Sequence, residues 1–372
     1  MSRIDACTTE EGKESMVRRE SGSSTFSRAG MLAAAALLAC AIIFAEGQAS
    51  SHALDTPPRL LSETGLYADA GALVVDPRNL PFSPQYPLWS DSAAKSRWIR
   101  LPSGGVIDGS DADAWTFPIG TRFWKEFSFE GHRVETRYME LQANGKWLYA
   151  SYEWSPDGRD ATLAPDRGRR DAFALGHGRF HGIPGTADCK VCHQGGPAEV
   201  LGFSTLQLSP AVDAAALHGA SGAAGIKLDY LIANGLIKGY ERWPSLAPVI
   251  EARSKAERLV LGYLHGNCGQ CHNSRASLAN LGMFLREELL LLPGSVVETI
   301  VGKPVKKSAP GQSADATYRI DPGHPERSAL LQRLSSRYPA LQMPPLGTVL
   351  VDDEAVAVVT KWIAELKVKE GQ

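Results

Sequence analysis

Between residues 54 and 175, apolar and polar positions alternate over short runs that Gly, Pro and Asp interrupt. In 134–141 and again in 147–154, every second side chain falls on the same face, which is typical of antiparallel strands with a buried face. The Asn-Gly pair in 143–145, between these runs, is a strong hairpin signal. We therefore predict a small antiparallel β-domain with strands at 121–129, 132–142, 146–154 and 161–163.

The pattern changes after residue 175, first to Gly- and His-rich sequence and then to helical stretches. Apolar residues recur every three or four positions between 356 and 366, which predicts a helix that Asp352 or Asp353 caps and that runs to about Val368. Another helix is predicted at 255–265, just before the second of two cysteine motifs. Shorter helices are predicted at 211–217 and 227–235.

The first 53 residues have the features of a secretory signal peptide: several arginines, an apolar run from Met31 to Ala45, and cleavage sites after Ala49 or Ala53. The apolar run is shorter than the roughly 20 residues that a membrane-spanning helix needs. If it were not cleaved, the chain would be weakly anchored to the membrane. Cys40 resembles a lipoprotein processing site, but apolar residues continue beyond it. We therefore expect an exported, periplasmic protein.

The composition is that of a globular protein, with 44% apolar and 22% charged residues. The formal net charge of -2 provides no basic field that could hold nucleic acid, so we expect no nucleic-acid partner. Cys7 and Cys40 lie in the leader, and the other four of the six cysteines form two pairs. The rest of the chain therefore has no spare disulfide framework.

Two segments have the pattern Cys-x-x-Cys-His, at 189–193 and 268–272. Two thiols three positions apart on a helical turn can each form a thioether to a haem vinyl group, and the following His then binds the iron. The predicted thioether residues are Cys189, Cys192, Cys268 and Cys271, and the predicted proximal ligands are His193 and His272.

Two other uses of Cys-x-x-Cys are disfavoured. The pairs of a zinc ribbon lie about 15 to 20 residues apart, whereas a much longer stretch separates Cys192 from Cys268. A thioredoxin-like pair lies between a strand and a helix of a βαβ unit, which this pattern does not predict. The chain has only nine histidines, so a His after both pairs would be a rare coincidence. We therefore expect two covalently attached haem c groups.

The second haem region, 251–372, contains a candidate for the sixth iron ligand. Met343 is followed by two prolines, which fix a rigid loop that would hold its soft thioether sulfur in place. The two helices that frame this region, with Gly262 on the first and Trp362 on the second, resemble class I cytochrome c, whose terminal helices cross with a glycine against an aromatic ring. The resemblance implies that His272 and Met343 are the axial ligands.

The first haem region, 176–250, contains no methionine that could serve as its sixth ligand. His181 is flanked by glycine and lies shortly before the first motif, so it could fold back across the haem, and we favour it. The other candidates are His177, His218, and Met139 of the β-domain.

Four segments of the chain form a set: 86–91, 115–121, 189–194 with 201–203, and 343–345. Together they resemble a family of bacterial diheme c-type cytochromes that joins an N-terminal β-domain to two haem regions. The resemblance implies a multidomain α+β fold in which an N-terminal antiparallel β-domain precedes two mainly α-helical cytochrome c-type regions. The expected domains are 1–53 (leader and signal peptide), 54–175 (β-domain), 176–250 (first haem) and 251–372 (second haem).

Electron transfer outside the cytoplasm is the function that these features imply. The chain would carry single electrons between redox partner proteins, such as a periplasmic dehydrogenase and a terminal acceptor, as a carrier more than as an enzyme. The missing methionine beside the first haem leaves an alternative, a diheme peroxidase-like enzyme with an open coordination site at that haem. The Trp-rich β-domain could instead bind a sugar, although rings of this size more often fill a core.

Overall fold

The computed structural model describes residues 56–219, 225–289 and 294–367. Residues 53–372 form one compact unit, which contains the predicted β-domain and both predicted haem regions. The predicted signal peptide, with Cys7 and Cys40, lies outside the described residues. No helix in the described part of the chain combines the length and the apolar character needed to cross a membrane.

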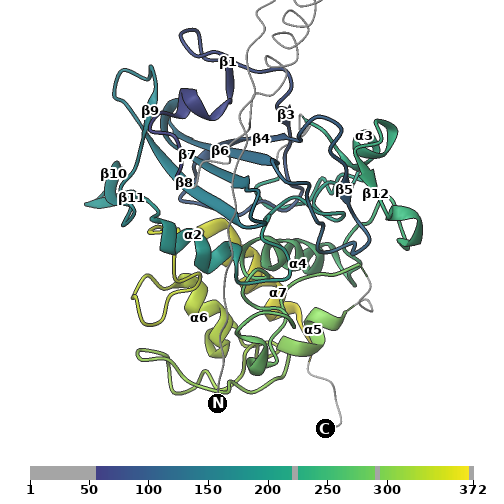
Figure 1. The fold of residues 1–372 in the computed structure, drawn as a ribbon. Helices are drawn as coiled ribbons and strands as arrows, with labels where there is room; N and C mark the ends of the chain where they lie inside the picture. Colours follow the sequence, from purple (N-terminus) through teal and green to yellow (C-terminus); the bar gives the residue numbers. More distant parts are fainter. Residues whose placement is uncertain (1–55, 220–224, 290–293, 368–372) are drawn as a thin grey trace, which may run out of the picture. The chain divides into compact units, whose positions relative to one another are not determined.

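A six-stranded antiparallel sheet, in the order β3-β4-β6-β7-β8-β9, is the largest element of the fold (Figure 1). The four strands predicted from alternation are confirmed as β6 to β9. The turn between β7 and β8 is also where the sequence predicts it, with Gly145 at a φ of 75°. The strands are β3 (Leu80–Pro81), β4 (Ala94–Arg100), β6 (Arg122–Phe129), β7 (His132–Leu141), β8 (Trp147–Trp154) and β9 (Ala161–Leu163).

Separate apolar cores cover the two faces of this sheet. One core contains Trp124 and Tyr138, and the other contains Phe123 and Met139 from the opposite face of the same strands. The tryptophan rings of the predicted β-domain therefore fill cores, and the described residues form no exposed aromatic platform for a sugar. The buried rings are those of Trp89, Trp115, Trp124 and Trp154, and those of Trp98 and Trp147 are partly buried.

Three two-stranded pairs complete the β structure. β5 and β12 pair in parallel through Ile107 and Ile237. This pairing joins the β part, which is the described portion of residues 54–175, to the segment after the first motif. The hairpin of β10 and β11 precedes the first motif, and its Phe173 stacks on Phe129 with 5.0 Å between ring centroids. The strands are β1 (Tyr67–Asp69), β2 (Val74–Val75), β5 (Ile107–Asp108), β10 (Arg169–Gly176), β11 (Arg179–Ile183) and β12 (Ile237–Lys238).

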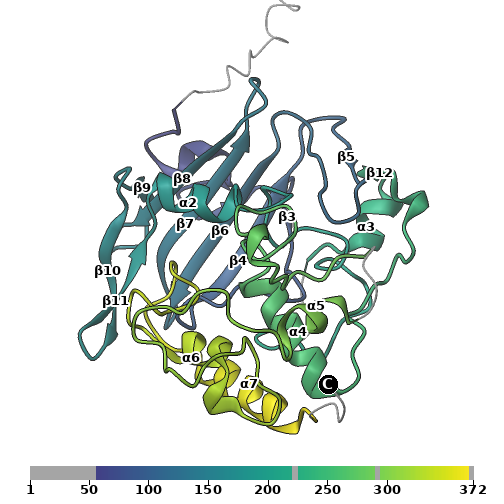
Figure 2. The same ribbon diagram turned by 90° about the horizontal axis from the view of Figure 1, so that it is seen from below.

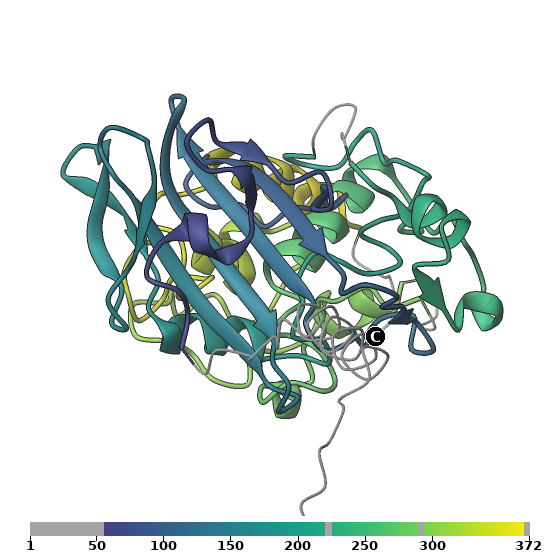
Figure 3. The ribbon, with the colours of Figure 1, turned by 45° about the horizontal axis from the view of Figure 1, so that its top comes forward.

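The longer helices of the C-terminal part, α4 to α7, gather on one side of the sheet (Figure 2), and Figure 3 shows the sheet lying in front of them. The α-helices are α2 (Thr186–His193), α3 (Leu228–Ala233), α4 (Lys255–Asn267), α5 (Ser295–Ile300), α6 (Ala329–Ser335) and α7 (Asp353–Glu365). The short 3-10 helices are η1 (Leu61–Thr64), η2 (Tyr240–Arg242), η3 (Ala279–Leu281) and η4 (Pro325–Arg327).

Helices α4 and α7 form where the sequence predicts them, and they pack against each other. Ser254 caps α4 by accepting a hydrogen bond from the Glu257 amide at 3.1 Å. Asp352 caps α7 by accepting one from the Ala355 amide at 3.1 Å. The apolar stripe of α7 is buried in the core that it shares with α4.

The predicted fold class is wrong, because neither haem region is mainly α-helical. Among the described residues, region 176–250 contains two short α-helices and the strands β11 and β12, and region 251–372 contains four α-helices of 6 to 13 residues with long loops between them. The physical reason is that these regions do not build their cores alone. They complete their cores with side chains of the β part, such as Tyr86 and Trp89, which belong to the same cluster as the apolar residues of α4 and α7.

The predicted helix at 211–217 is also wrong, because this segment forms turns. Its alanines favour a helix, but Asp213 is held by two residues of the β part. The Asp213 amide donates to Gln85 Oε1 at 2.7 Å, and Tyr86 Oη donates to the Asp213 carboxylate at 3.1 Å. Tertiary contacts thus override helix propensity here. The helix predicted at 227–235 is confirmed as the shorter α3.

The aromatic ring against Gly262 is not the one that the class I cytochrome resemblance implies. A Cβ atom on Gly262 would lie 2.5 Å from Cδ1 of Tyr86, and its nearest neighbours all belong to that ring and not to Trp362. A Cβ on Gly266 would lie 2.5 Å from the Tyr86 carbonyl oxygen. Both glycines therefore let the chain at Tyr86 approach α4 closely.

Candidate haem attachment site

The first motif lies on α2, which packs against β8. Cys189 contacts the apolar core on that face of the sheet, and the ring centroid of His193 lies 5.2 Å from that of Tyr149 on β8. The residues Cys189, Cys192 and His193 are all partly exposed, unlike the buried apolar residues of the core that lies beneath them. The motif thus offers its three functional side chains at a surface that a planar group could cover.

The ring of His193 is held in the orientation that a proximal ligand requires. Its Nδ1 lies 2.6 Å from the carbonyl oxygen of Glu199, to which a protonated Nδ1 donates. This hydrogen bond fixes the tautomer and leaves Nε2 as the nitrogen that can bind a metal. Burial, together with the nearby charges of Lys125 and Arg137, lowers the pKa of His193 to about 4, although the hydrogen bond to Glu199 opposes this shift. The ring is therefore neutral near pH 7, which is the form that binds iron.

The second motif continues directly from the C-terminal end of α4. The Cys268 amide donates to the Leu264 carbonyl at 2.9 Å, and the His272 amide donates to the Cys268 carbonyl at 3.0 Å, so helical turns carry on through the motif. Burial also lowers the pKa of His272, which keeps this ring neutral. The buried Nδ1 of His272 has no hydrogen-bond partner of good geometry among the described residues. The nearby Met283 backbone opposes the effect of burial, because it raises the pKa of the ring.

The four motif cysteines are free thiols. Burial raises the pKa of each of them, and that of Cys268 reaches about 12, so they are not thiolates near pH 7. Within the described ranges, no three His, Cys, Asp or Glu side chains converge as the donors of a bare metal ion would. Each thiol pair is followed by a neutral imidazole on the same turn.

The two motifs are distant in the sequence, but the loop that follows the first lies against the second in the fold. The loop after the first motif passes the second motif at Gly195 and Gly196. A Cβ on Gly196 would lie 3.0 Å from the carbonyl oxygen of Gln270, which stands between the two cysteines of the second motif. Asn273 holds this carbonyl through a hydrogen bond of 3.0 Å. Two groups attached to these motifs would therefore be close neighbours.

Met343 lies in a loop that other contacts bring toward the second motif. Its amide donates to the Arg333 carbonyl at 3.0 Å, and the charge of Arg333 is near enough to His272 to lower the pKa of that ring. The far end of the loop is held by Asp91, which accepts hydrogen bonds from the Val349 and Leu350 amides at 2.8 and 2.9 Å. The fold thus places the loop in the right region, and ligation by Met343 stays a prediction.

His181 is buried between two carboxylates. Its Nε2 lies 3.0 Å from Glu135 and its Nδ1 lies 3.4 Å from Asp91. Burial alone would lower the pKa of His181, but these hydrogen bonds to Asp91 and Glu135 raise it. Neither nitrogen is free for iron, so the geometry gives no support to His181 as the sixth ligand of the first haem.

The other three candidates for that ligand are no better placed. His218 is paired with Asp352 at 2.8 Å, and Met139 is packed into the apolar core. His177 is exposed at the tip of the β10–β11 hairpin, with a φ of 50°. His181 and His218 are thus engaged with carboxylates, whereas Met139 pairs across the sheet with Tyr149, whose ring lies against that of His193.

The sequence analysis did not identify a row of basic residues on the face of the sheet that lies toward the first motif. Arg97, Lys125 and Arg137 occupy directly paired positions on β4, β6 and β7. The alternation of β6 contains the signal, because Lys125 shares its face with the apolar Phe123 and Phe127.

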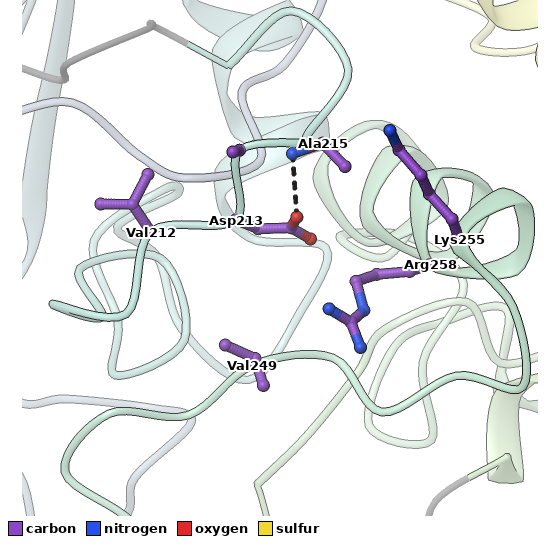
Figure 4. A pocket seen from close by; sticks show the side chains of 7 residues that line it. Val212, Asp213, Ala215, Val249, Lys255 and Arg258 are labelled. Atoms are coloured by element: carbon purple, nitrogen blue, oxygen red, sulfur yellow. Dashed lines mark hydrogen bonds between the residues drawn. The ribbon is translucent and has the colours of Figure 1, made fainter.

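A shallow pocket lies at the opposite end of α4 from the second motif (Figure 4). Arg258 and Lys255 reach it from α4, and the Asp213 carboxylate on its other side accepts a hydrogen bond from the Ala215 amide at 3.0 Å. Neither a cysteine nor a histidine lines it, so it is separate from the two motifs.

Comparison of the chain with family models, with curated proteins and with solved structures finds no match. The resemblance to bacterial diheme cytochromes therefore stays a prediction. What the structure adds to it is the geometry of the two motifs: neutral histidines, part-exposed thiols and direct contact between the motif segments.

Proposed function

We propose that this chain is an exported c-type cytochrome with two covalently attached haems that moves single electrons between redox partner proteins in the periplasm. One observation carries the proposal: the chain has two Cys-x-x-Cys-His motifs, at 189–193 and 268–272, and in a single compact fold the loop that follows the first, at Gly195 and Gly196, lies against Gln270 of the second. One motif alone would make a simple carrier. Two attachment sites in neighbouring segments give a path along which an electron can enter at one and leave at the other.

The chain's own residues have separate parts in this function. A bound haem supplies a one-electron couple whose potential depends on its axial ligands and surroundings. His193 and His272 are the proximal ligands, and the Glu199 carbonyl orients the first of these rings. The glycines at 195 and 196 keep the motif segments close, because a side chain there would push against Gln270.

The surroundings of the first motif suit exchange with a partner protein. Lys190, Val191 and Gln194 are exposed, and the Val191 side chain between the two thiols is 51% exposed. A group attached there would have an edge near solvent, where a dehydrogenase or a terminal acceptor could dock. The leader, with its signal-peptide features, would take the chain to the compartment where thioethers are formed.

A second candidate is a diheme peroxidase-like enzyme, and one observation favours it. His181 and His218, two of the residues considered as sixth ligand of the first haem, are each paired with a carboxylate in the described structure. An iron with an open sixth position can bind peroxide. The ferric spin state separates the two functions, since the carrier requires two low-spin haems and the peroxidase one high-spin haem.

The proposal is tested on protein matured in a bacterial periplasm. Haem per chain is measured by the reduced pyridine spectrum and by mass in the wild type, in Cys189→Ala/Cys192→Ala and in Cys268→Ala/Cys271→Ala. We expect two haems in the wild type and one in each variant, with Val191→Ala as a matched control that keeps two. A wild type without covalent haem would overturn the proposal.

A further inference from the structure

The sheet face that meets the first motif carries a row of charges across its centre. Arg97 on β4 pairs with Lys125 on β6, Lys125 pairs with Arg137 on β7, and Arg137 pairs with Ser151 on β8. The row is flanked by apolar residues of the same face, including Phe127. Basic side chains in directly opposed positions disfavour each other's charge, and burial together with the charges of Arg97 and Arg137 lowers the pKa of Lys125 well below its ordinary value.

These cations are poorly compensated by the protein. Arg97 is only 9% exposed and has no hydrogen-bond or ion-pair partner among the described residues. The Lys125 ammonium lies 4.8 Å from the centroid of the Phe127 ring, over which the Arg137 guanidinium also lies at 4.3 Å. Lys95, on the same face, donates to the Ala93 carbonyl at 3.0 Å. Burying charges without counterions is costly, so a further anion is expected.

The nearby carboxylates are already engaged elsewhere. Glu135 binds Arg137 at 2.6 Å and His181 at 3.0 Å. Asp91 lies 3.4 Å from His181 and accepts hydrogen bonds from two amides of the Met343 loop. Four cations thus face two carboxylates, and His181 between them adds to the positive side when it is protonated. Arg97 and Lys125 are the two that remain without an anionic partner.

The row leads directly to the first motif. Ser151, at its end, donates a hydrogen bond to the Pro184 carbonyl at 3.0 Å, just before α2 begins. Tyr149, on the same strand and the same face, has its ring against that of His193. Figure 2 shows α2 lying over this part of the sheet, beside β8, β7 and β6.

We propose that the row of Arg97, Lys125 and Arg137 is an anion site that takes the propionate carboxylates of the first haem. This assignment of the anion site rests on the proposed function, because the carboxylates belong to the first haem. Guanidinium and ammonium groups form charge-assisted hydrogen bonds with carboxylates, and arginine can do so through two parallel bonds. A free phosphate or sulfate ion has the same chemistry, so the experiment must separate the two sources.

The test uses the diheme holoprotein. Arg97→Gln and Lys125→Met are compared with Arg133→Gln, whose side chain pairs with Glu126 on the opposite face of the sheet. Both row variants keep two haems but lower the midpoint potential of the first haem, because a cation near the propionates stabilises the reduced, more negative state. A tenfold change in the ratio of reduced to oxidised haem corresponds to about 59 mV for one electron. The control leaves the potential unchanged.

The first haem is identified by the absence of its redox wave from Cys189→Ala/Cys192→Ala. Arg97→Lys keeps the charge and restores the potential, which separates the electrostatic effect from misfolding. An unchanged potential in both row variants overturns the inference, and so does a new ferric spectrum in Lys125→Met, which would make that lysine an iron ligand. Stabilisation of the wild-type holoprotein by sulfate or phosphate would instead mean a site for free anions. A wild type lacking haem would count against the proposed function itself.

Discussion

Replacing Gly262 by alanine should weaken the contact that joins the β part to the helix leading into the second motif. A Cβ at this position would lie 2.5 Å from Cδ1 and 2.6 Å from Cε1 of Tyr86, well inside van der Waals contact. Tyr86 is only 2% exposed, so its ring has little room to move. Its Oη donates to Asp213 at 3.1 Å and its amide donates to Gln207 at 2.8 Å, which hold it at both ends.

Two opposing effects set the magnitude. Alanine in place of glycine inside a helix ordinarily stabilises by about 1 kcal/mol, whereas overpacking a core costs about 1–3 kcal/mol. Because Tyr86 is anchored, we expect the clash to prevail and the free energy of unfolding to fall by about 1–2 kcal/mol. In a Tyr86→Leu background the ring is gone, and the same substitution should be neutral or stabilising, a coupling of about 2 kcal/mol.

Urea denaturation of the four proteins of this cycle measures the effect. Lys255→Ala, at an exposed position of the same helix, is the control and should change stability by less than about 0.5 kcal/mol. The reasoning is refuted if Gly262→Ala is as stable as the wild type, or if the two substitutions are additive.

Three further predictions concern the same framework. Hydrogen bonds to Asp91 and Glu135 raise the pKa of His181 above its ordinary value of 6.5. Their contribution to the stability of the fold is complete below pH 6.5, and it is lost as the pH rises through the raised pKa. His181→Gln should therefore lose this dependence in denaturation measured across neutral pH. Asp352→Ala removes the cap of α7 and the partner of His218, and should cost about 1–2 kcal/mol in urea denaturation. Met343→Ala should abolish the weak long-wavelength band of methionine-ligated ferric haem.

Each of these has an outcome that contradicts it. A His181→Gln protein with the wild-type dependence on pH would place the responsible group elsewhere. Asp352→Asn keeps a capping oxygen and should lose less stability than Asp352→Ala, so equal losses would argue against the cap. Survival of the long-wavelength band in Met343→Ala would assign the ligand to another residue.

Elements with a local signal could be predicted from the sequence. The strands from 121 to 163 follow from alternation, and the turn at Gly145 follows from the Asn-Gly pair before it. Helix α7 follows from its spacing of apolar residues and from its capping residue Asp352, and α4 lies where a helix was predicted before the second motif. These signals depend on neighbours within a few positions, so a single sequence contains them.

Features that depend on distant partners could not be predicted. Asp213 sits in a helix-favouring run but is held in a turn by Gln85 and Tyr86. The contact between the two motifs joins Gly196 to Gln270, and no local pattern encodes it. His181 looked like a free ligand because its carboxylate partners come from other segments of the chain. The prediction of two separate helical haem regions failed for the same reason.

Ferric electron paramagnetic resonance on the periplasmically matured protein tests the central claim most directly, because it reports the number of haems, their spin states and their mutual distance. The account predicts two low-spin haems whose signals are altered by spin coupling, since the loop directly after the motif at 189–193 lies against the motif at 268–272. Each single-haem variant should then show a simpler, uncoupled signal. A wild-type spectrum equal to the sum of the two single-haem spectra would contradict the adjacency of the haems, and a single haem signal would contradict the account as a whole.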